Sequence, residues 1–201
     1  METKNLTGEY GKIWDLALPL LKRGRLGDDK HALEVVDLIM NYKGKLRLDK
    51  DVLIPVAIMH DIGHSAILPE HFKFVTGPEK IANAKLVHML TGAKIAKEIL
   101  DSIGYNSEKI KEIIDIISIH DADQLTGIDS DRIYNSENKR IFHDIDSLDR
   151  FNKERLDLFK KQFKDRDSGY IKEQLLTSMK MIFYPEFRKI AEERVKKLGI
   201  L

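Results

Sequence analysis

Hydrophobic positions along most of the chain recur every three or four residues, which is the pattern of amphipathic helices. This spacing predicts helices over about 9–22, 28–42, 51–62, 81–103, 107–120 and 140–150. Further helices follow, punctuated by Gly169 and Pro185. Neither a repeat nor an alternation of strands with helices interrupts the pattern. The sequence therefore predicts an all-α fold, with the polar stretches 66–79 and 121–138 as loops.

The segment 51–62 differs from the others because it is apolar nearly all round, which predicts a buried helix. It runs directly into His60 and Asp61. An imidazole and a carboxylate taken out of water need hydrogen bonds or a cation. Gly63 is predicted to end the helix and to leave His64 one turn beyond His60, at the rim of the same site. Both interpretations stay open for this stretch: neighbouring helix ends satisfy the pair, or a divalent metal does.

Three more histidines fall on the inner face or at the end of other predicted helices: His31, His88 and His120. An acidic residue of 140–150 joins them, although periodicity does not choose between Asp144 and Asp146. Seven histidines scattered at random would not be expected to gather in this way. Their joint placement makes a metal site the leading interpretation.

Other charged and titratable residues are less informative. Arg23 and Arg25, in the basic turn after the first helix, fit either a phosphate contact or a solvated helix end that complements the helix dipole. His71 lies in the loop 66–79, where a substrate contact and an ordinary surface position are both open. The pattern assigns no role to His143.

Composition narrows the possible chemistry. The 34 basic and 33 acidic residues nearly balance, so there is no global electrostatic case for binding nucleic acid or a membrane. The absence of cysteine excludes thiolate ligands, which favours iron, manganese, cobalt, nickel, zinc or magnesium held by nitrogen and oxygen. The first ten residues lack the apolar core of a signal peptide, and no stretch approaches the ~20 apolar residues of a membrane span. We expect a cytoplasmic protein with one domain over 1–201.

The order of a histidine, a His–Asp pair and a late aspartate resembles the HD-domain superfamily of metal-dependent phosphohydrolases. The resemblance covers about 28–151 and leaves 152–201 as a helical C-terminal extension of an all-α HD-domain bundle. It implies that one metal is held by His31, His60, Asp61 and Asp146, because Ile145–Asp146–Ser147–Leu148 matches the late motif better than Asp144 does. Members with two metals add two histidines, which His88 and His120 match, with Asp61 as the expected bridging carboxylate.

The resemblance also implies a function: hydrolysis of a phosphate ester or anhydride by water activated at one or two divalent ions. Asp61 and His64 are the implied catalytic residues, His64 as general acid or phosphate contact. We expect a small phosphorylated substrate, in the first place a nucleotide, but the sequence does not indicate which residues bind it. The motifs that mark cyclic-dinucleotide phosphodiesterases, deoxynucleotide triphosphohydrolases and alarmone hydrolases are absent or incomplete. Oxygenase chemistry at two irons, or a non-catalytic module that senses nucleotide or metal, are the alternatives.

Overall fold

The computed structural model describes residues 6–68, 70, 77–125, 127–162 and 168–199. His71 therefore lies outside the described residues. The regular elements of the described residues are all helices, which confirms the predicted all-α fold. The chain divides into two compact units, and the boundary falls between Phe142 and His143, inside helix α7 (Glu137–Ser147). The expectation of one domain over 1–201 stays a prediction.

The first unit contains α1 (Gly8–Arg23), α2 (Asp28–Met40), α3 (Lys50–Met59), η2 (Ile62–Ala66), α4 (Gly77–Ser102), α5 (Ser107–Ile117), η4 (Ala122–Gln124), α6 (Ser130–Ile133) and the start of α7. Most predicted helices lie within a few residues of these bounds. The stretch 121–138, which we predicted to be a loop, instead contains the short helices η4 and α6.

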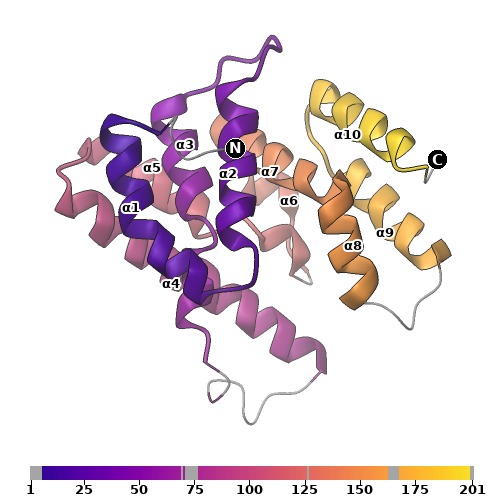
Figure 1. The fold of residues 1–201 in the computed structure, drawn as a ribbon, viewed down its shortest axis with the longest axis horizontal. Helices are drawn as coiled ribbons and strands as arrows, with labels where there is room; N and C mark the ends of the chain where they lie inside the picture. The colour runs from indigo at the N-terminus through magenta and orange to yellow at the C-terminus, as the bar shows by residue number, and fades with distance from the viewer. Residues whose placement is uncertain (1–5, 69, 71–76, 126, 163–167, 200–201) are drawn as a thin grey trace. The chain divides into compact units, whose positions relative to one another are not determined.

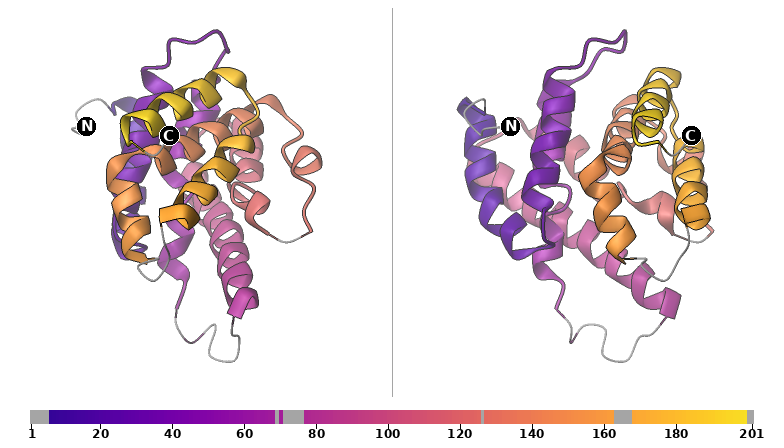
Figure 2. Two further views of the ribbon diagram at one scale, coloured as in Figure 1. Left: turned by 90° about the vertical axis from the view of Figure 1, so that its right-hand side faces the viewer. Right: turned by 45° about the vertical axis from the view of Figure 1, so that its right-hand side comes forward.

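Helix α3 lies at the centre of the first unit. Every residue from Val52 to Met59 is buried, which confirms the predicted burial of this helix on all sides. It packs against α1, α2 and α5. Figures 1 and 2 show α1 and α2 side by side, with α3 behind them in the view of Figure 1. The end of α3 consequently delivers His60 and Asp61 into the interior of this unit.

The short helix η2 packs closely against α4, and Gly63 makes this approach possible. A Cβ atom on Gly63 would lie 1.9 Å from the carbonyl oxygen of His88 and 2.7 Å from the backbone nitrogen of Gly92. Gly63 is not among the glycines with positive φ, so close packing and not a left-handed turn requires glycine here. The contact brings the chain around Asp61 against the middle of α4.

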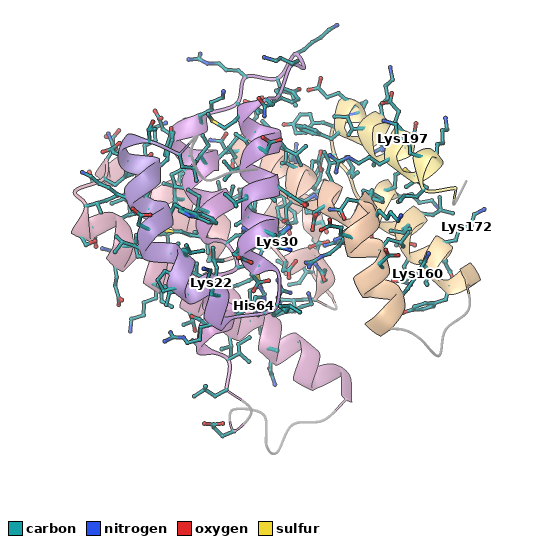
Figure 3. The ribbon with its side chains drawn as sticks, viewed as in Figure 1. Lys22, Lys30, His64, Lys160, Lys172 and Lys197 are labelled. Carbon is teal, nitrogen blue, oxygen red and sulfur yellow. The ribbon has the colours of Figure 1, made fainter. Side chains whose placement is uncertain are left out.

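The second unit contains the end of α7, η5 (Leu148–Phe151), α8 (Lys153–Gln162), α9 (Ser168–Lys180) and α10 (Pro185–Lys197). Helix α10 packs against α9 and η5, where Arg194 donates a hydrogen bond to the carbonyl oxygen of Leu148 at 2.8 Å. Exposed lysines, three of which Figure 3 labels (Lys160, Lys172 and Lys197), lie on the outer faces of these helices. Among the described residues, no helix is both long and apolar enough to cross a membrane.

Candidate metal centre

One carboxylate, that of Asp61, lies among five histidine side chains. Asp61 is buried, with 3% of its surface exposed. Its Oδ2 atom lies 3.4 Å from Nε2 of His60 and 3.9 Å from Nε2 of His31. Its Oδ1 atom faces the Nε2 atoms of three others, at 3.4 Å for His64, 3.7 Å for His120 and 4.0 Å for His88. The two oxygens of the Asp61 carboxylate thus face different sets of imidazole rings.

These side chains come from separate elements of the first unit. His31 stands in the first turn of α2, His60 and Asp61 follow α3, and His88 occupies the inner side of α4. His120 follows the end of α5. All four of these histidines are buried, as their positions on the apolar faces predicted. The structure therefore brings together the five candidate ligands that the sequence placed on the second to fifth predicted helices.

Hydrogen bonds to the backbone fix how three of the rings present their nitrogens. The Nδ1 atoms of His60, His88 and His120 lie 3.1, 3.3 and 2.8 Å from the carbonyl oxygen of the residue three or four positions earlier. A carbonyl oxygen can only accept, so each Nδ1 carries the hydrogen and donates it. In the neutral ring the Nε2 atom is then left with a lone pair. Histidines that bind metals are commonly oriented in this way.

The Nε2 atoms lie in two close pairs. Those of His31 and His60 are 3.0 Å apart, and those of His88 and His120 are 3.2 Å apart. Burial, reinforced by His120 and His64, lowers the pKa of His88 to about 3, so this ring is neutral at physiological pH. Two pairs of imidazole nitrogens beside one carboxylate offer the nitrogen and oxygen donors of a metal site. The donor set fits two metal positions, His31–His60–Asp61 and Asp61–His88–His120.

Arg25 is a charged partner of this cluster that the sequence did not reveal. Its Nη2 donates a hydrogen bond to Oδ2 of Asp61 at 2.5 Å, and its Nε donates to Oδ1 of Asp28 at 3.1 Å. Burial would raise the pKa of the Asp61 carboxyl, but the Arg25 guanidinium and His60 outweigh burial and hold this pKa well below its usual range. Neither sequence interpretation of Arg25, a phosphate contact or a solvated helix end, describes this ion pair.

The comparison with protein families decides the relationship. The family model of the HD domain matches residues 28–151, more than half of the chain. The chain belongs to the HD-domain family. This confirms the resemblance that the order of histidines and aspartates indicated. No curated protein and no solved structure matches the chain.

In this HD domain His64 lies deeper than the predicted rim position. Its ring stacks on that of His88, with centroids 4.1 Å apart and planes 10° apart, and 11% of its side chain is exposed. It lies by the C-terminal end of α1, where Gly24 packs against it (Figure 3). Its Nε2 atom is buried and forms no hydrogen bond with any described residue. A buried nitrogen of this kind, close to Oδ1 of Asp61, is available to a metal or a substrate.

Two residues of the predicted loop 121–138 support the centre of the HD domain. Tyr134, 1% exposed, donates a hydrogen bond from its hydroxyl to the carbonyl oxygen of His120 at 2.9 Å. Asp121 lies with Oδ2 3.7 Å from Nε2 of His88 and pairs with Lys85 at 3.1 Å. Because this stretch has no clear helical periodicity, sequence reasoning missed both residues.

The candidates for the late aspartate lie in the second unit, on the last part of α7. Asp144 is fully buried, and its carboxylate accepts hydrogen bonds from the backbone nitrogens of Phe183 at 2.9 Å and Tyr184 at 2.7 Å. His143 also contacts it, with Nδ1 3.1 Å from Oδ1. Both oxygens of Asp144 thus accept hydrogen bonds from residues of the second unit. Asp146 is half-buried on the same helix, and its assignment as a metal ligand stays a prediction.

Proposed function

We propose that this HD domain is a metal-dependent phosphohydrolase that cleaves a phosphate ester or anhydride of a small substrate, with nucleotides as the expected class. The observation that supports this proposal is the position of Asp61, whose Oδ2 atom faces the Nε2 atoms of two histidines while its Oδ1 atom faces those of three others. Two metals joined by one carboxylate are a recurrent arrangement in enzymes that displace a group at phosphorus.

The proposed ligands divide between the two oxygens of Asp61. His31 and His60 would hold one ion together with Oδ2, and Asp146 is the proposed further ligand there. His88 and His120 would hold the second ion together with Oδ1. Divalent ions bound at these positions supply a hydroxide nucleophile near neutral pH and positive charge beside the phosphoryl oxygens.

The protein's own groups prepare this chemistry in two ways. Backbone carbonyls hold the Nδ1 hydrogens of His60, His88 and His120, so that Nε2 is the donor atom presented to the site. His64 places Nε2 3.4 Å from Oδ1 of Asp61, with its ring held flat against His88. We assign it to protonating the leaving oxygen or contacting a phosphoryl oxygen, since an imidazole can hold and transfer a proton near neutral pH.

The test is release of phosphate from a panel of nucleotides and sugar phosphates, with each of the candidate metals added in turn. Asp61→Asn keeps the size of the side chain and removes the bridging charge, so we expect activity to fall about 100-fold or more. Asp101→Asn, the same change at an exposed position of α4, serves as the control and should keep full activity. A folded Asp61→Asn protein with wild-type activity would reject the proposal.

The alternatives use the same donors, and the same assay separates them. Oxygen consumption without release of phosphate would identify oxygenase chemistry in place of hydrolysis. Binding of metal and nucleotide without release of any product would identify a sensing module.

A further inference from the structure

The guanidinium of Arg25 reaches from solvent into the buried centre. About half of its side chain, 47%, is exposed, whereas the side chain of Asp61 is 4% exposed. Its Nη2 atom ends on Oδ2 of Asp61, the oxygen that also faces His31 and His60. A protein cation therefore contacts the oxygen that the proposed function assigns to a metal.

The Nε edge of the guanidinium and the backbone of Arg25 both bond to the carboxylate of Asp28. Nε of Arg25 donates to Oδ1 of Asp28, while the backbone N–H of Arg25 donates to Oδ2 of the same carboxylate at 2.9 Å. Asp28 is fully buried. Gly24 lies against it: a Cβ atom there would be 3.0 Å from Oδ2 of Asp28 and 3.2 Å from Cβ of His64. The guanidinium is rigid and moves as one unit, so it can leave Asp61 only from an anchor at the backbone N–H of Arg25, which stays on Asp28 beside His64.

A divalent ion on Oδ2 and the guanidinium would repel each other, because both are cations directed at one oxygen. We infer that Arg25 is an exchangeable partner of Asp61: it gives up Oδ2 to the metal and turns its guanidinium to a phosphoryl oxygen of the substrate, while its backbone N–H stays on Asp28. The second half of this inference rests on the proposed function, since it takes the substrate to be a phosphate compound. Guanidinium suits the role because its planar donors match two oxygens of a phosphate.

A different role for Arg25 predicts the opposite result. If Arg25 stayed on Asp61 and oriented it for the metal, removing Arg25 would weaken metal binding, as the loss of such outer partners does at other sites. If Arg25 and the metal exclude each other, removing Arg25 strengthens metal binding. The sign of the change therefore decides between the two roles.

The first experiment measures Mn²⁺ affinity from the electron paramagnetic resonance of the free ion. His120→Ala isolates the half of the centre formed by His31 and His60, and His31→Ala isolates the other half. In the His120→Ala background, Arg25→Gln should bind Mn²⁺ about tenfold more tightly. In the His31→Ala background the same change should have little effect, because Arg25 contacts Oδ2 and not Oδ1. Unchanged or weaker binding in the first background would overturn the inference.

One further variant controls for the loss of charge, and another replaces Arg25→Gln if it does not fold. Arg23→Gln removes the same charge from an exposed position two residues earlier and should leave Mn²⁺ affinity unchanged in both backgrounds. Arg25→Met removes the charge but keeps a long stem, and it replaces Arg25→Gln if that protein does not fold. A gain in affinity that Arg23→Gln reproduced would come from net charge alone and would also overturn the inference.

The second experiment measures the binding of inorganic phosphate to the Mn²⁺-loaded protein by calorimetry. Arg25→Gln should weaken phosphate binding about tenfold, the expected cost of a lost charged hydrogen bond. Equal affinity would show that the guanidinium does not turn to the anion. Neither titration needs turnover. Shifts of the expected sign in a protein that hydrolyses nothing would reject the proposed function alone, and hydrolysis with unshifted binding would reject this inference alone.

Discussion

The Nε2 atoms of His88 and His120 lie 3.2 Å apart, and the Nδ1 atom of each ring faces a backbone carbonyl. The carbonyls fix the hydrogens on Nδ1, so each ring turns its Nε2 atom to the same space beside Oδ1 of Asp61. Packing of α4 against η2 and α5 holds this arrangement. The energetic cost of placing three electron-rich groups together is what a bound cation would offset.

The lowered pKa of His88 predicts how stability depends on pH once metal is removed by a chelator. His88 has a pKa of about 3 in the folded protein against 6.5 ordinarily, so between these values the unfolded chain binds a proton that the folded protein does not. The free energy of unfolding should therefore fall as the pH is lowered through this window, by up to ~1.4 kcal/mol per pH unit from this group. Urea unfolding from pH 7 to 4.5 measures the slope. His88→Gln should flatten it; parallel curves for the two proteins would contradict the assignment.

Tyr134→Phe tests the support of His120. The change removes the hydroxyl that donates to the His120 carbonyl oxygen in a buried environment, so we expect a loss of about 1 kcal/mol in the free energy of unfolding. It should also weaken metal binding in a His31→Ala background, where only the half containing His120 remains. Tyr170→Phe, the same change in the second unit, is the matched control for metal binding. Equal metal affinity with and without Tyr134→Phe in the His31→Ala background would show that the turn holds without the hydroxyl.

Gly63→Ala should be among the most damaging single changes in the first unit. Its Cβ atom would lie 1.9 Å from a backbone oxygen of α4, so η2 must move away, at a cost of about 3 kcal/mol or more. Gly92→Ala faces the same contact from the other side, but its nearest atom lies at 3.3 Å and alanine favours the helix. We expect this second variant to stay within ~1 kcal/mol of wild type in urea unfolding. Similar losses in the free energy of unfolding for Gly63→Ala and Gly92→Ala would contradict the finding that the contact leaves no room for a Cβ atom at Gly63 but leaves room for one at Gly92.

Asp144→Asn and Asp146→Asn should separate a structural carboxylate from a metal-binding one. Asp144→Asn replaces one of the two oxygens that accept from the backbone nitrogens of Phe183 and Tyr184 with an amide group, so unfolding should become easier by about 2 kcal/mol. Asp146→Asn should instead lower metal affinity in a His120→Ala background, with a smaller loss of stability in the presence of chelator. Urea unfolding and Mn²⁺ titration of both variants give the comparison. Loss of metal affinity in Asp144→Asn alone would reverse the assignment of the late aspartate.

Periodicity predicted the helices and the inward histidines because burial of an apolar face determines both. His31, His60, Asp61, His88 and His120 each stand on such a face or at the end of such a helix. That these side chains meet in one site could be inferred only because so many of them were predicted to face inward. The family resemblance then indicated which of them share a metal. Periodicity could not separate Asp144 from Asp146, because the chain is buried on nearly every side from 141 to 149, at the end of α7 and the start of η5.

Arg25 and Gly63 show what the sequence could not provide. A long side chain in a turn can point in many directions, and the ion pair of Arg25 with Asp61 depends on Asp28 and on the position of α3. Gly63 was predicted to turn the chain, whereas the structure requires glycine because α4 passes too close for a side chain. Both features depend on contacts between segments far apart in the sequence, which local patterns do not encode.

The measurement that tests the account most directly is the metal content per chain, by elemental analysis of protein purified without chelator and with oxygen excluded. We predict about two equivalents in the wild type, falling to about one in His120→Ala or in His31→Ala, because each substitution removes one nitrogen and so breaks one of the two nitrogen pairs beside Asp61. A single equivalent in the wild type that His120→Ala leaves unchanged would contradict a centre with two metals bridged by Asp61.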